Sequence, residues 1–289
     1  MTVTSAIPPR PARPARRTLG ALCATALATL ALPHAVSAQG RLDAQYEATL
    51  AGIPVGRGAW TIDIGDDQYS ASANGGTIGL LKAFAAGSGT SAAQGKVVSG
   101  ALIGTNYFAS TKTPKKTESV HITLANGNVK EYGIQPEPPP EPQRLPVSDA
   151  QRRGVFDPMT AAMLRVPGTA DPLTADACHA NAAVFDGRVR YDLKLNFKRM
   201  DMVKAAKGYY GPAVVCAVSF TPIAGYIPDR PVIKYLTAER NMEIAFAPVA
   251  GTRYLVPFRI VIPTPLGVAR LDAIQFITQA MPPHVAKTQ

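Results

Sequence analysis

The chain has 289 residues, a formal net charge of +10 and three cysteines. Its positive charge is spread along the chain, and no dense run of lysine and arginine is interleaved with aromatic residues, which argues against a nucleic-acid-binding protein. Lys112, Lys115 and Lys116 around Pro114 form the one cluster of cations, which is typical of a solvated loop.

The N-terminus has the composition of an export signal. Four arginines and no acidic residue precede an apolar run over residues 19–32, which ends at Pro33 and the small residues Val36-Ser37-Ala38. The run is shorter than the ~20 residues that a membrane-spanning helix needs. We therefore predict a signal peptide over residues 1–38, cleaved after Ala38, with no transmembrane segment afterwards. Its removal takes away four arginines and lowers the net charge from +10 to +6.

The route of export stays open. Cys23 follows Leu22 rather than a small residue, which does not fit a lipid-attachment site, so we assign it to the discarded signal. Arg16-Arg17 matches a twin-arginine signal in part, and the general secretory route is the default. Either route predicts a periplasmic protein.

Two cysteines remain after the signal, Cys178 and Cys216. An isolated pair in an oxidising compartment usually forms a disulfide, and no C-x-x-C redox motif is present. We therefore predict a structural disulfide between them.

Residues 39–289 have the pattern of a β-rich domain. Asn126-Gly127 is typical of a tight hairpin, and residues 188–198 alternate apolar and polar side chains throughout. The predicted strands are 46–50, 59–64, 69–73, 91–98, 107–111, 118–124, 129–134, 188–198, 213–221, 232–238, 242–247, 254–262 and 267–278.

Three segments depart from this pattern. Residues 78–86 have apolar residues near helical spacing, and Asp157 followed by Pro158 predicts a helix of two to three turns over residues 157–165. The proline-rich segment 136–146 favours an exposed extended loop. It is typical of a spacer, and docking of this loop to a partner is the alternative.

Sequential hairpins without alternating β and α units predict a mainly β fold, a single curved antiparallel sheet or incomplete β-barrel with one or two short helices. Such a sheet leaves a concave face that binds apolar ligands in other proteins. The candidate lining of this groove comprises Trp60, Phe84, Tyr107, Phe197 and Phe220, although an ordinary core would also account for these aromatic residues.

The sequence contains no G-x-S-x-G, S-x-x-K, H-E-x-x-H, phosphate-loop or dinucleotide motif. We therefore assign no catalytic, cofactor-binding or metal-binding residue. Cys178-His179, with Asp176 beside them, is the one place that invites a nucleophile or metal site, and a surface histidine near a disulfide explains it more simply.

Several short motifs resemble the exported family called domain of unknown function 3108. They are Tyr46-x-x-x-Leu50-x-Gly52-Ile53-Pro54-Val55-Gly56, Phe156-Asp157-Pro158-Met159-Thr160-Ala161, Val184-Phe185-Asp186-Gly187-Arg188-x-Arg190-Tyr191-x-Leu193, Cys216, Tyr254-Leu255-Val256-Pro257-Phe258-Arg259 and Thr264-Pro265-Leu266-Gly267. The resemblance implies a periplasmic β-rich domain without assigned catalytic residues. It also implies a fold similar to the half-open sheets of lipoprotein carriers and of periplasmic β-spiral envelope-integrity proteins.

The leading hypothesis is a non-enzymatic periplasmic protein that supports the cell envelope. Its concave face would bind an apolar ligand or a partner, for which a lipid, a lipoprotein and an envelope protein are the candidates. Two alternatives remain: a hydrolase or other enzyme with a site near Cys178 and His179, and a structural scaffold that docks through its proline-rich loop.

Overall fold

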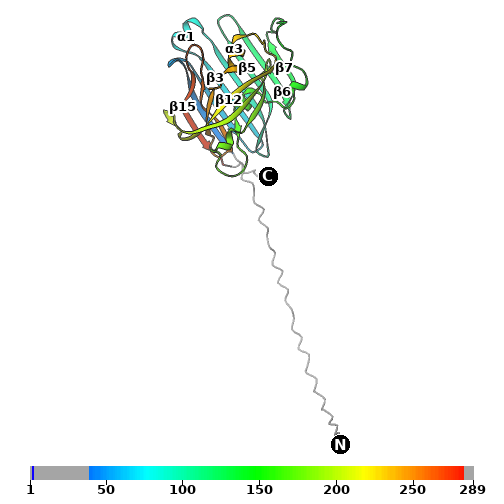
Figure 1. Cartoon of the computed structure of the whole chain (residues 1–289), viewed down its shortest axis with the longest axis vertical. Coiled ribbons are helices and arrows are strands. Elements are labelled where there is room, and N and C mark those ends of the chain that lie inside the picture. Colours follow the sequence, from blue (N-terminus) through cyan, green and yellow to red (C-terminus); the bar gives the residue numbers. More distant parts are fainter. Residues whose placement is uncertain (1, 3–38, 283–289) are drawn as a thin grey trace, which may run out of the picture. The chain divides into compact units, whose positions relative to one another are not determined.

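The computed structural model describes residue 2 and residues 39–282, so the predicted signal peptide falls almost entirely outside the described residues. Fifteen strands belong to one sheet (Figure 1), whose main path runs β7-β6-β5-β4-β3-β2-β1-β15-β14-β13-β12-β10-β9 and is antiparallel throughout. Two short strands lie off this path, β11 beside β15 and β8 beside β14. The fold class predicted from the sequence is confirmed.

The strands are β1 (Gly40–Leu50), β2 (Ile53–Ile64), β3 (Gln68–Thr77), β4 (Ser88–Val98), β5 (Ala101–Lys112), β6 (Thr117–Ala125), β7 (Asn128–Gln135), β8 (Leu164–Arg165), β9 (Asn181–Phe185), β10 (Arg190–Lys204), β11 (Lys207–Gly208), β12 (Tyr210–Ala224), β13 (Glu243–Pro248), β14 (Tyr254–Ile262) and β15 (Ala269–Ala280). The first seven form a meander of hairpins. β1 then pairs with β15, so the strands nearest the two chain ends lie side by side at the centre of the sheet.

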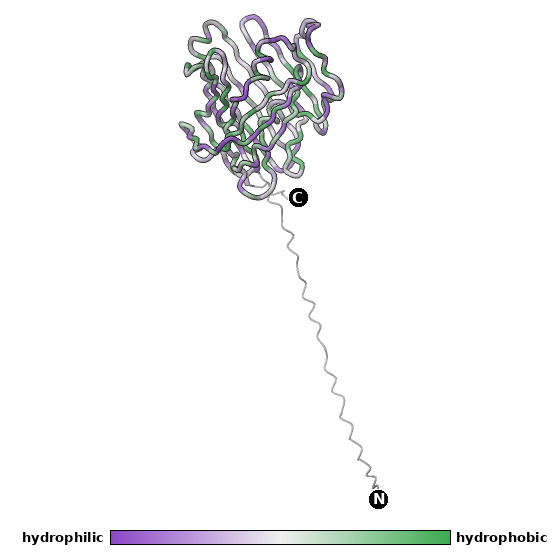
Figure 2. Tube along the Cα trace, viewed as in Figure 1, coloured by the Kyte–Doolittle hydropathy of each residue, from purple (hydrophilic) through white to green (hydrophobic). Residues whose placement is uncertain are grey.

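Alternation along the strands separates a core face from a solvent face. In β1, Leu42, Ala44 and Tyr46 are buried, whereas the residues between them are exposed. Figure 2 shows the same change between hydrophobic and hydrophilic residues along neighbouring strands. Because side chains point to opposite faces with a period of two, all buried residues of β1 contribute to one core.

The sheet curls but does not close by strand pairing. Its register shifts in several strand pairs, for example between Gln45 and Tyr46 in the β1–β15 pair and between Ala48 and Thr49 in the β1–β2 hairpin, and such bulges increase local twist. The strands at the two ends of the path, β7 and β9, do not pair with each other.

A short segment fills the gap between the edges of β7 and β9. We call this gap, together with the contacts that cross it, the seam. The Val155 N–H donates to the Gly127 carbonyl beside β7 at 2.8 Å. The Phe156 N–H donates to Ala183 in β9 at 2.8 Å, and the Phe156 carbonyl accepts from Phe185 at 3.0 Å. The two edges of the sheet are thus joined through residues 155–156.

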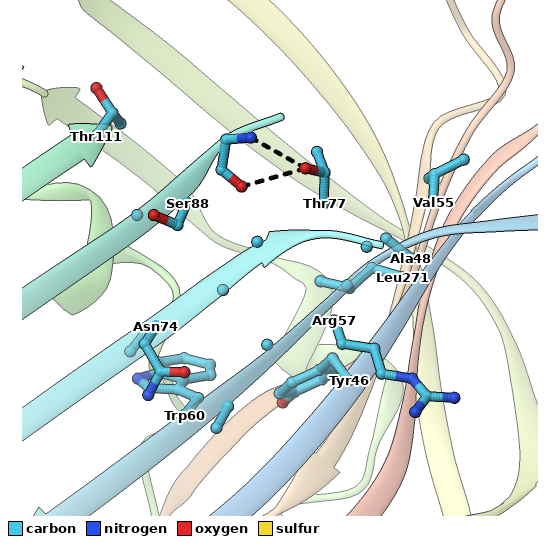
Figure 3. Close-up of a pocket in the computed structure, with 18 of the residues that line it drawn as sticks. Tyr46, Ala48, Val55, Arg57, Trp60, Asn74, Thr77, Ser88, Thr111 and Leu271 are labelled. Atoms are coloured by element: carbon cyan, nitrogen blue, oxygen red, sulfur yellow. Dashed lines mark hydrogen bonds between the residues drawn. The ribbon is translucent and has the colours of Figure 1, made fainter. Parts of the chain in front are cut away.

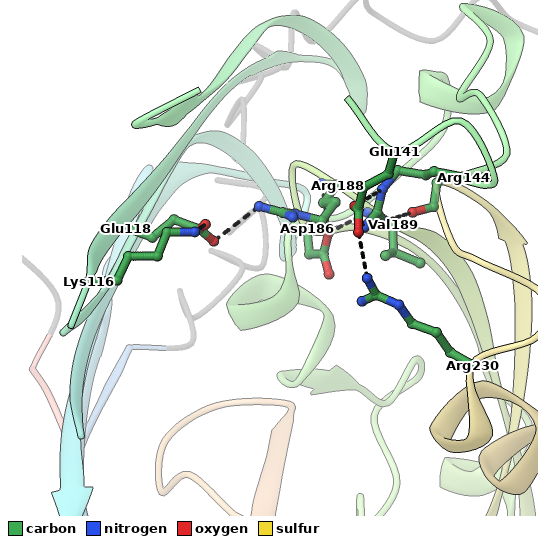
Figure 4. Close-up of polar contacts among 9 residues, drawn as sticks. Lys116, Glu118, Glu141, Arg144, Asp186, Arg188, Val189 and Arg230 are labelled. Atoms are coloured by element: carbon green, nitrogen blue, oxygen red, sulfur yellow. Dashed lines mark hydrogen bonds and ion pairs between the residues drawn. The ribbon is translucent and has the colours of Figure 1, made fainter. Parts of the chain in front are cut away.

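Ion pairs add to the seam (Figure 4). Glu118 on β6 accepts from Lys116 and from Arg188, which lies in the loop between β9 and β10. In the proline-rich loop, Glu141 accepts from Arg144 and from Arg230. These contacts tie loops that are far apart in sequence to the same end of the sheet.

The proline-rich loop is exposed over most of its length, but its backbone is also hydrogen-bonded to the domain at Leu145. The Leu145 N–H donates to Tyr226, and the Leu145 carbonyl accepts from Gly225, both at 2.9 Å. This part of the loop therefore has its backbone hydrogen bonds within the chain.

The helices are short and two of them differ from expectation. α1 (Gly79–Phe84) lies where helical spacing was predicted. α2 (Pro158–Ala161) is one turn rather than two to three, because residues 164–165 leave the helix to pair with β14. Residues 232–238 belong to α3 (Pro231–Ala238), so the predicted strand is wrong there. Pro231 at the first helical position presets the backbone for a helix and outweighs the strand preference of Val232 and Ile233. Two 3₁₀ turns, η1 (Ala150–Arg152) and η2 (Ala175–Cys178), complete the elements.

The predicted disulfide is confirmed. Cys178 in η2 is bonded to Cys216 in β12, with their Cα atoms 5.5 Å apart. Both belong to a small buried cluster with Val214, Phe246 and Leu255. Val214 and Cys216 alternate with Ala213 and Val215 of the main core, so this cluster covers the outer face of the sheet. No helix within the described part of the chain is long and apolar enough to span a membrane.

Candidate functional site

The inward-facing side chains of the meander change in size along each strand. In β2, Ile62 and Trp60 fill the interior, and the next inward positions are Gly58 and Gly56. In β3 the inward-facing side chains also become smaller, from Tyr69 and Ala71 to Ala73 and Gly75. In β4 they change from Ala93 to Gly89. Because glycine and alanine leave space where larger residues would pack, the interior is filled at one end of the sheet and hollow at the other.

This hollow end is a cavity of about 720 Å³. Tyr46 and Trp60 line it at the side of the filled interior (Figure 3). Leu81 of α1 also belongs to the lining. Pro257, Ile260 and Leu271 line it from β14 and β15. Its volume lies within the range of about 300–1,000 Å³ that is usual for small-molecule sites.

Little of the cavity surface is polar, although Asn74, Ser88 and Thr111 belong to the lining (Figure 3). The Tyr46 hydroxyl donates to the Pro257 carbonyl at 2.8 Å, and burial raises the pKa of Tyr46, so it stays neutral. The Thr77 hydroxyl accepts from the Gly87 N–H at 3.0 Å (Figure 3). The Trp60 Nε1 is buried without a hydrogen-bond partner among the described residues. A ligand that fits this lining must be largely apolar.

The charges of the lining are all positive. Arg57 and Lys112 line the cavity, and none of the described lining residues is Asp, Glu, His or Cys. Arg57 pairs with Glu47 at 2.8 Å, whereas no ion pair of Lys112 is found within residues 39–282. Hydroxyl groups such as that of Ser88 therefore lie in the lining without a histidine or carboxylate of the described lining beside them.

A buried polar network lies on α2. Asp157 accepts from the Met159 and Thr160 N–H groups at 3.0 and 2.9 Å and from the Thr160 hydroxyl at 2.5 Å. The Thr160 hydroxyl also contacts the Tyr69 hydroxyl at 2.6 Å. Burial raises the pKa of Asp157 although these hydrogen bonds oppose the shift. Through the Tyr69 hydroxyl, the network ties α2 to β3, and Asp157 also lines an adjoining cavity of about 190 Å³.

The structure separates the aromatic residues that the sequence suggested for the groove. Trp60 lines the cavity. Tyr107 is buried in the same core but is not part of the lining, and Phe220 packs against Tyr191 with ring centroids 5.4 Å apart. Phe197 is 41% exposed opposite Cys216. The side chain of Phe84 lies outside the described residues.

Most of the lining has no direct signal in the sequence, because small residues are not conspicuous in a strand pattern. The alternative site near Cys178 and His179 lacks a free thiol, since Cys178 is in the disulfide. The His179 Nδ1 atom lies 3.5 Å from the Asp176 Oδ1 atom, and both side chains are largely exposed. No cavity described above includes them.

Fold and cavity together define a β-barrel-like protein with an open sheet and a hollow, apolar end. The profile of the family described as proteins of unknown function, DUF3108, matches residues 45–274. The chain belongs to this family, as its motifs predicted.

One solved structure that resembles the chain is the crystal structure of a β-barrel-like protein of domain of unknown function DUF1849 from Brucella abortus. The identity is 9% and the TM-score 0.44, over 84% of this chain and 98% of that chain. No curated protein gives a significant match.

Proposed function

We propose that the mature chain is a non-enzymatic periplasmic protein of the cell envelope that binds an apolar ligand in the cavity between the meander and β14–β15. Export rests on the N-terminal sequence, with its arginines, apolar run and small-residue site. A carrier or sensor of a lipid is the role that this cavity suits best.

The observation that carries the proposal is the character of the cavity. Its volume of about 720 Å³ accommodates a small molecule, and its surface is largely apolar, with few polar side chains and no carboxylate or histidine among the described lining residues. Burial of apolar surface would supply most of the binding free energy. A cavity of this kind favours binding over catalysis.

The first experiment is to purify the mature protein from the periplasm, extract it with organic solvent and analyse the extract by mass spectrometry. A defined lipid at near-equimolar amount is the expected result. A clean extract, together with no binding of added lipid, would refute the proposal and favour a protein partner, which a crosslinking search would then identify. N-terminal sequencing of the same sample tests cleavage after Ala38.

A variant that fills the cavity makes the test specific. Ala73 lies directly opposite Trp60 in the β2–β3 pair and lines the cavity, so Ala73→Leu should occupy space that the ligand needs. Because that space is empty, we expect the fold to persist and the ligand to be lost. The matched control is Ser72→Leu, one residue away on the opposite, exposed face of β3, which should retain the ligand. Equal retention by both variants would place the ligand elsewhere.

A further inference from the structure

The cavity has a closed end and an open end, which fixes how a long ligand must lie. Beyond Trp60 and Tyr46 the interior is filled by Leu42, Ile62 and Tyr69, all almost fully buried. Towards the other end, the lining reaches Val55 and the loops that follow β3 and β5. A ligand therefore has one end at Trp60 and the other at these loops.

The depth of the cavity matches one acyl chain. Trp60 and Val55 are five residues apart in β2, which at 3.3 Å per residue corresponds to roughly 16 Å. Half of the hydrocarbon core of a bilayer is about 15 Å thick, and this is the length of one ordered acyl chain. A single chain can thus extend from the loops to the indole ring.

The loops at the open end carry a strong excess of positive charge. Residues 78–87 and 112–116 contain four lysines, Lys82, Lys112, Lys115 and Lys116, and no acidic residue. The two segments are neighbours, because Ser88 pairs with Lys112 and a Cβ at Gly87 would lie 3.6 Å from the Lys112 carbonyl. Lys116 is paired with Glu118, while Lys82, Lys112 and Lys115 have no ion pair within the described part. Of these three, Lys112 lines the cavity itself, and Lys82 and Lys115 lie in the two neighbouring segments.

We infer that the ligand is a single acyl chain with an anionic headgroup, bound with its methyl end at Trp60 and its headgroup at Lys112 and the neighbouring lysines. This inference rests on the proposed function and names its ligand class. A carboxylate and a phosphate fit the lysines equally well, so a fatty acid and a lysophospholipid share the required chemistry.

The chain provides its own probe. Trp60 is the only tryptophan in the sequence, and it lines the cavity. Its fluorescence reports directly on a ligand that reaches the closed end. We would titrate delipidated full-length mature protein with hexadecanoate, a hexadecanoyl lysophosphatidylglycerol and the uncharged hexadecanol.

Both anionic probes should change the Trp60 fluorescence at concentrations about tenfold lower than hexadecanol, and high salt should reduce the difference. Tight binding of only one anion would identify the carboxylate or the phosphate as the source, and would still support the inference. Equal affinity for all three probes would contradict the inference that the headgroup is anionic. The proposed binding of an apolar ligand would still stand. Failure of all three, with no lipid in the extract, would refute both.

The lysines are tested with the triple variant Lys82→Gln, Lys112→Gln and Lys115→Gln. It should bind hexadecanoate about tenfold more weakly and hexadecanol unchanged. The matched control is the double variant Lys96→Gln with Lys130→Gln. These two lysines lie in β4 and β7, outside the open end, and have no ion pair in the described region. The control should bind both probes as the wild type does. An equal loss for the alcohol, or an equal loss in the control, would contradict the headgroup assignment.

Orientation is tested with brominated fatty acids, since bromine quenches tryptophan fluorescence at short range. Bromine near the methyl end should quench Trp60 more strongly than bromine near the carboxylate. The reverse order would overturn the tail-first orientation, and it would leave binding itself intact.

Discussion

Arg188 donates to Glu118 across the seam, with the Nη2 and Oε1 atoms 3.2 Å apart. The two residues come from the loop between β9 and β10 and from β6, which no strand pairing connects. In a closed barrel, hydrogen bonds between strands would join these edges. Here the closure depends on side chains, on residues 155–156 and on one tight glycine contact.

That glycine is Gly187, beside Arg188. Its φ is +94°, and a Cβ there would lie 2.3 Å from Val120 Cγ1 on β6. Gly187→Ala should therefore destabilise the protein twice over, by backbone strain and by steric overlap at the seam. We expect a loss of about 2 to 4 kcal/mol in the free energy of unfolding, measured by urea denaturation.

Gly168→Ala separates the two effects. Gly168 has a φ of +83° and no atom within 4 Å of an added Cβ, so this variant should lose only about 1 kcal/mol. If the two variants lose equal stability, the contact of Gly187 with Val120 contributes nothing to the seam.

The ion pair itself should contribute little and depend on pH. The Lys116 hydrogen bond, followed by the charge of Arg188, holds the pKa of Glu118 below its usual range. A lowered pKa of an acid gives stability at neutral pH that is lost as the pH falls through the folded-state pKa. Glu118→Gln should cost about 0.5 to 1 kcal/mol at pH 7 and nothing at pH 2.

Chemical denaturation at several pH values measures this difference. Glu131→Gln, on the exposed edge strand β7 and without an ion pair in the described residues, is the control and should be neutral at every pH. A difference between wild type and Glu118→Gln that persists at pH 2 would show that the charge of Glu118 is not its cause.

Asp157 should show the opposite dependence on pH. Because burial raises its pKa on folding, the wild type should lose stability as the pH rises from the unfolded-state pKa, about 3.9, through the raised folded-state value. Asp157→Asn keeps an acceptor for the α2 backbone and should lack this dependence. Asp157→Ala removes the cap and leaves buried donors unpaired, at a cost of about 2 to 4 kcal/mol. Parallel pH dependence of wild type and Asp157→Asn would mean that another group titrates.

The disulfide should be needed for stability and not for ligand binding. It closes a loop with a sequence separation of 38, so replacing both cysteines by alanine should cost about 3 to 4 kcal/mol. The bond lies on the outer face of the sheet, away from the cavity lining. We therefore expect the double variant to bind hexadecanoate as the wild type does at a temperature where it is folded, measured by Trp60 fluorescence. A loss of binding by folded variant protein would show that the outer cluster shapes the cavity.

Much of the architecture follows from local sequence, and the site does not. Alternation and the Asn126-Gly127 turn predict the meander because hairpins form between neighbouring residues, and the cysteine pair predicts its bond. The cavity depends on which alternate positions face inward in several strands at once, and this is set by register and bulges. The contact of Gly187 with Val120 joins positions 67 residues apart, and no local pattern reports it.

The pairing of β1 with β15 has a consequence for how the chain folds during synthesis or translocation. β1 to β7 can form hairpin by hairpin as the chain emerges, since each strand pairs with the one before it. β1 keeps one edge unpaired until residues 269–280 arrive, more than 200 residues later. Such distant contacts slow folding, and an open strand edge invites aggregation. Until residues 269–280 are available, β1 therefore exposes the strand edge that ends in the middle of the sheet, and a chaperone would protect it from aggregation.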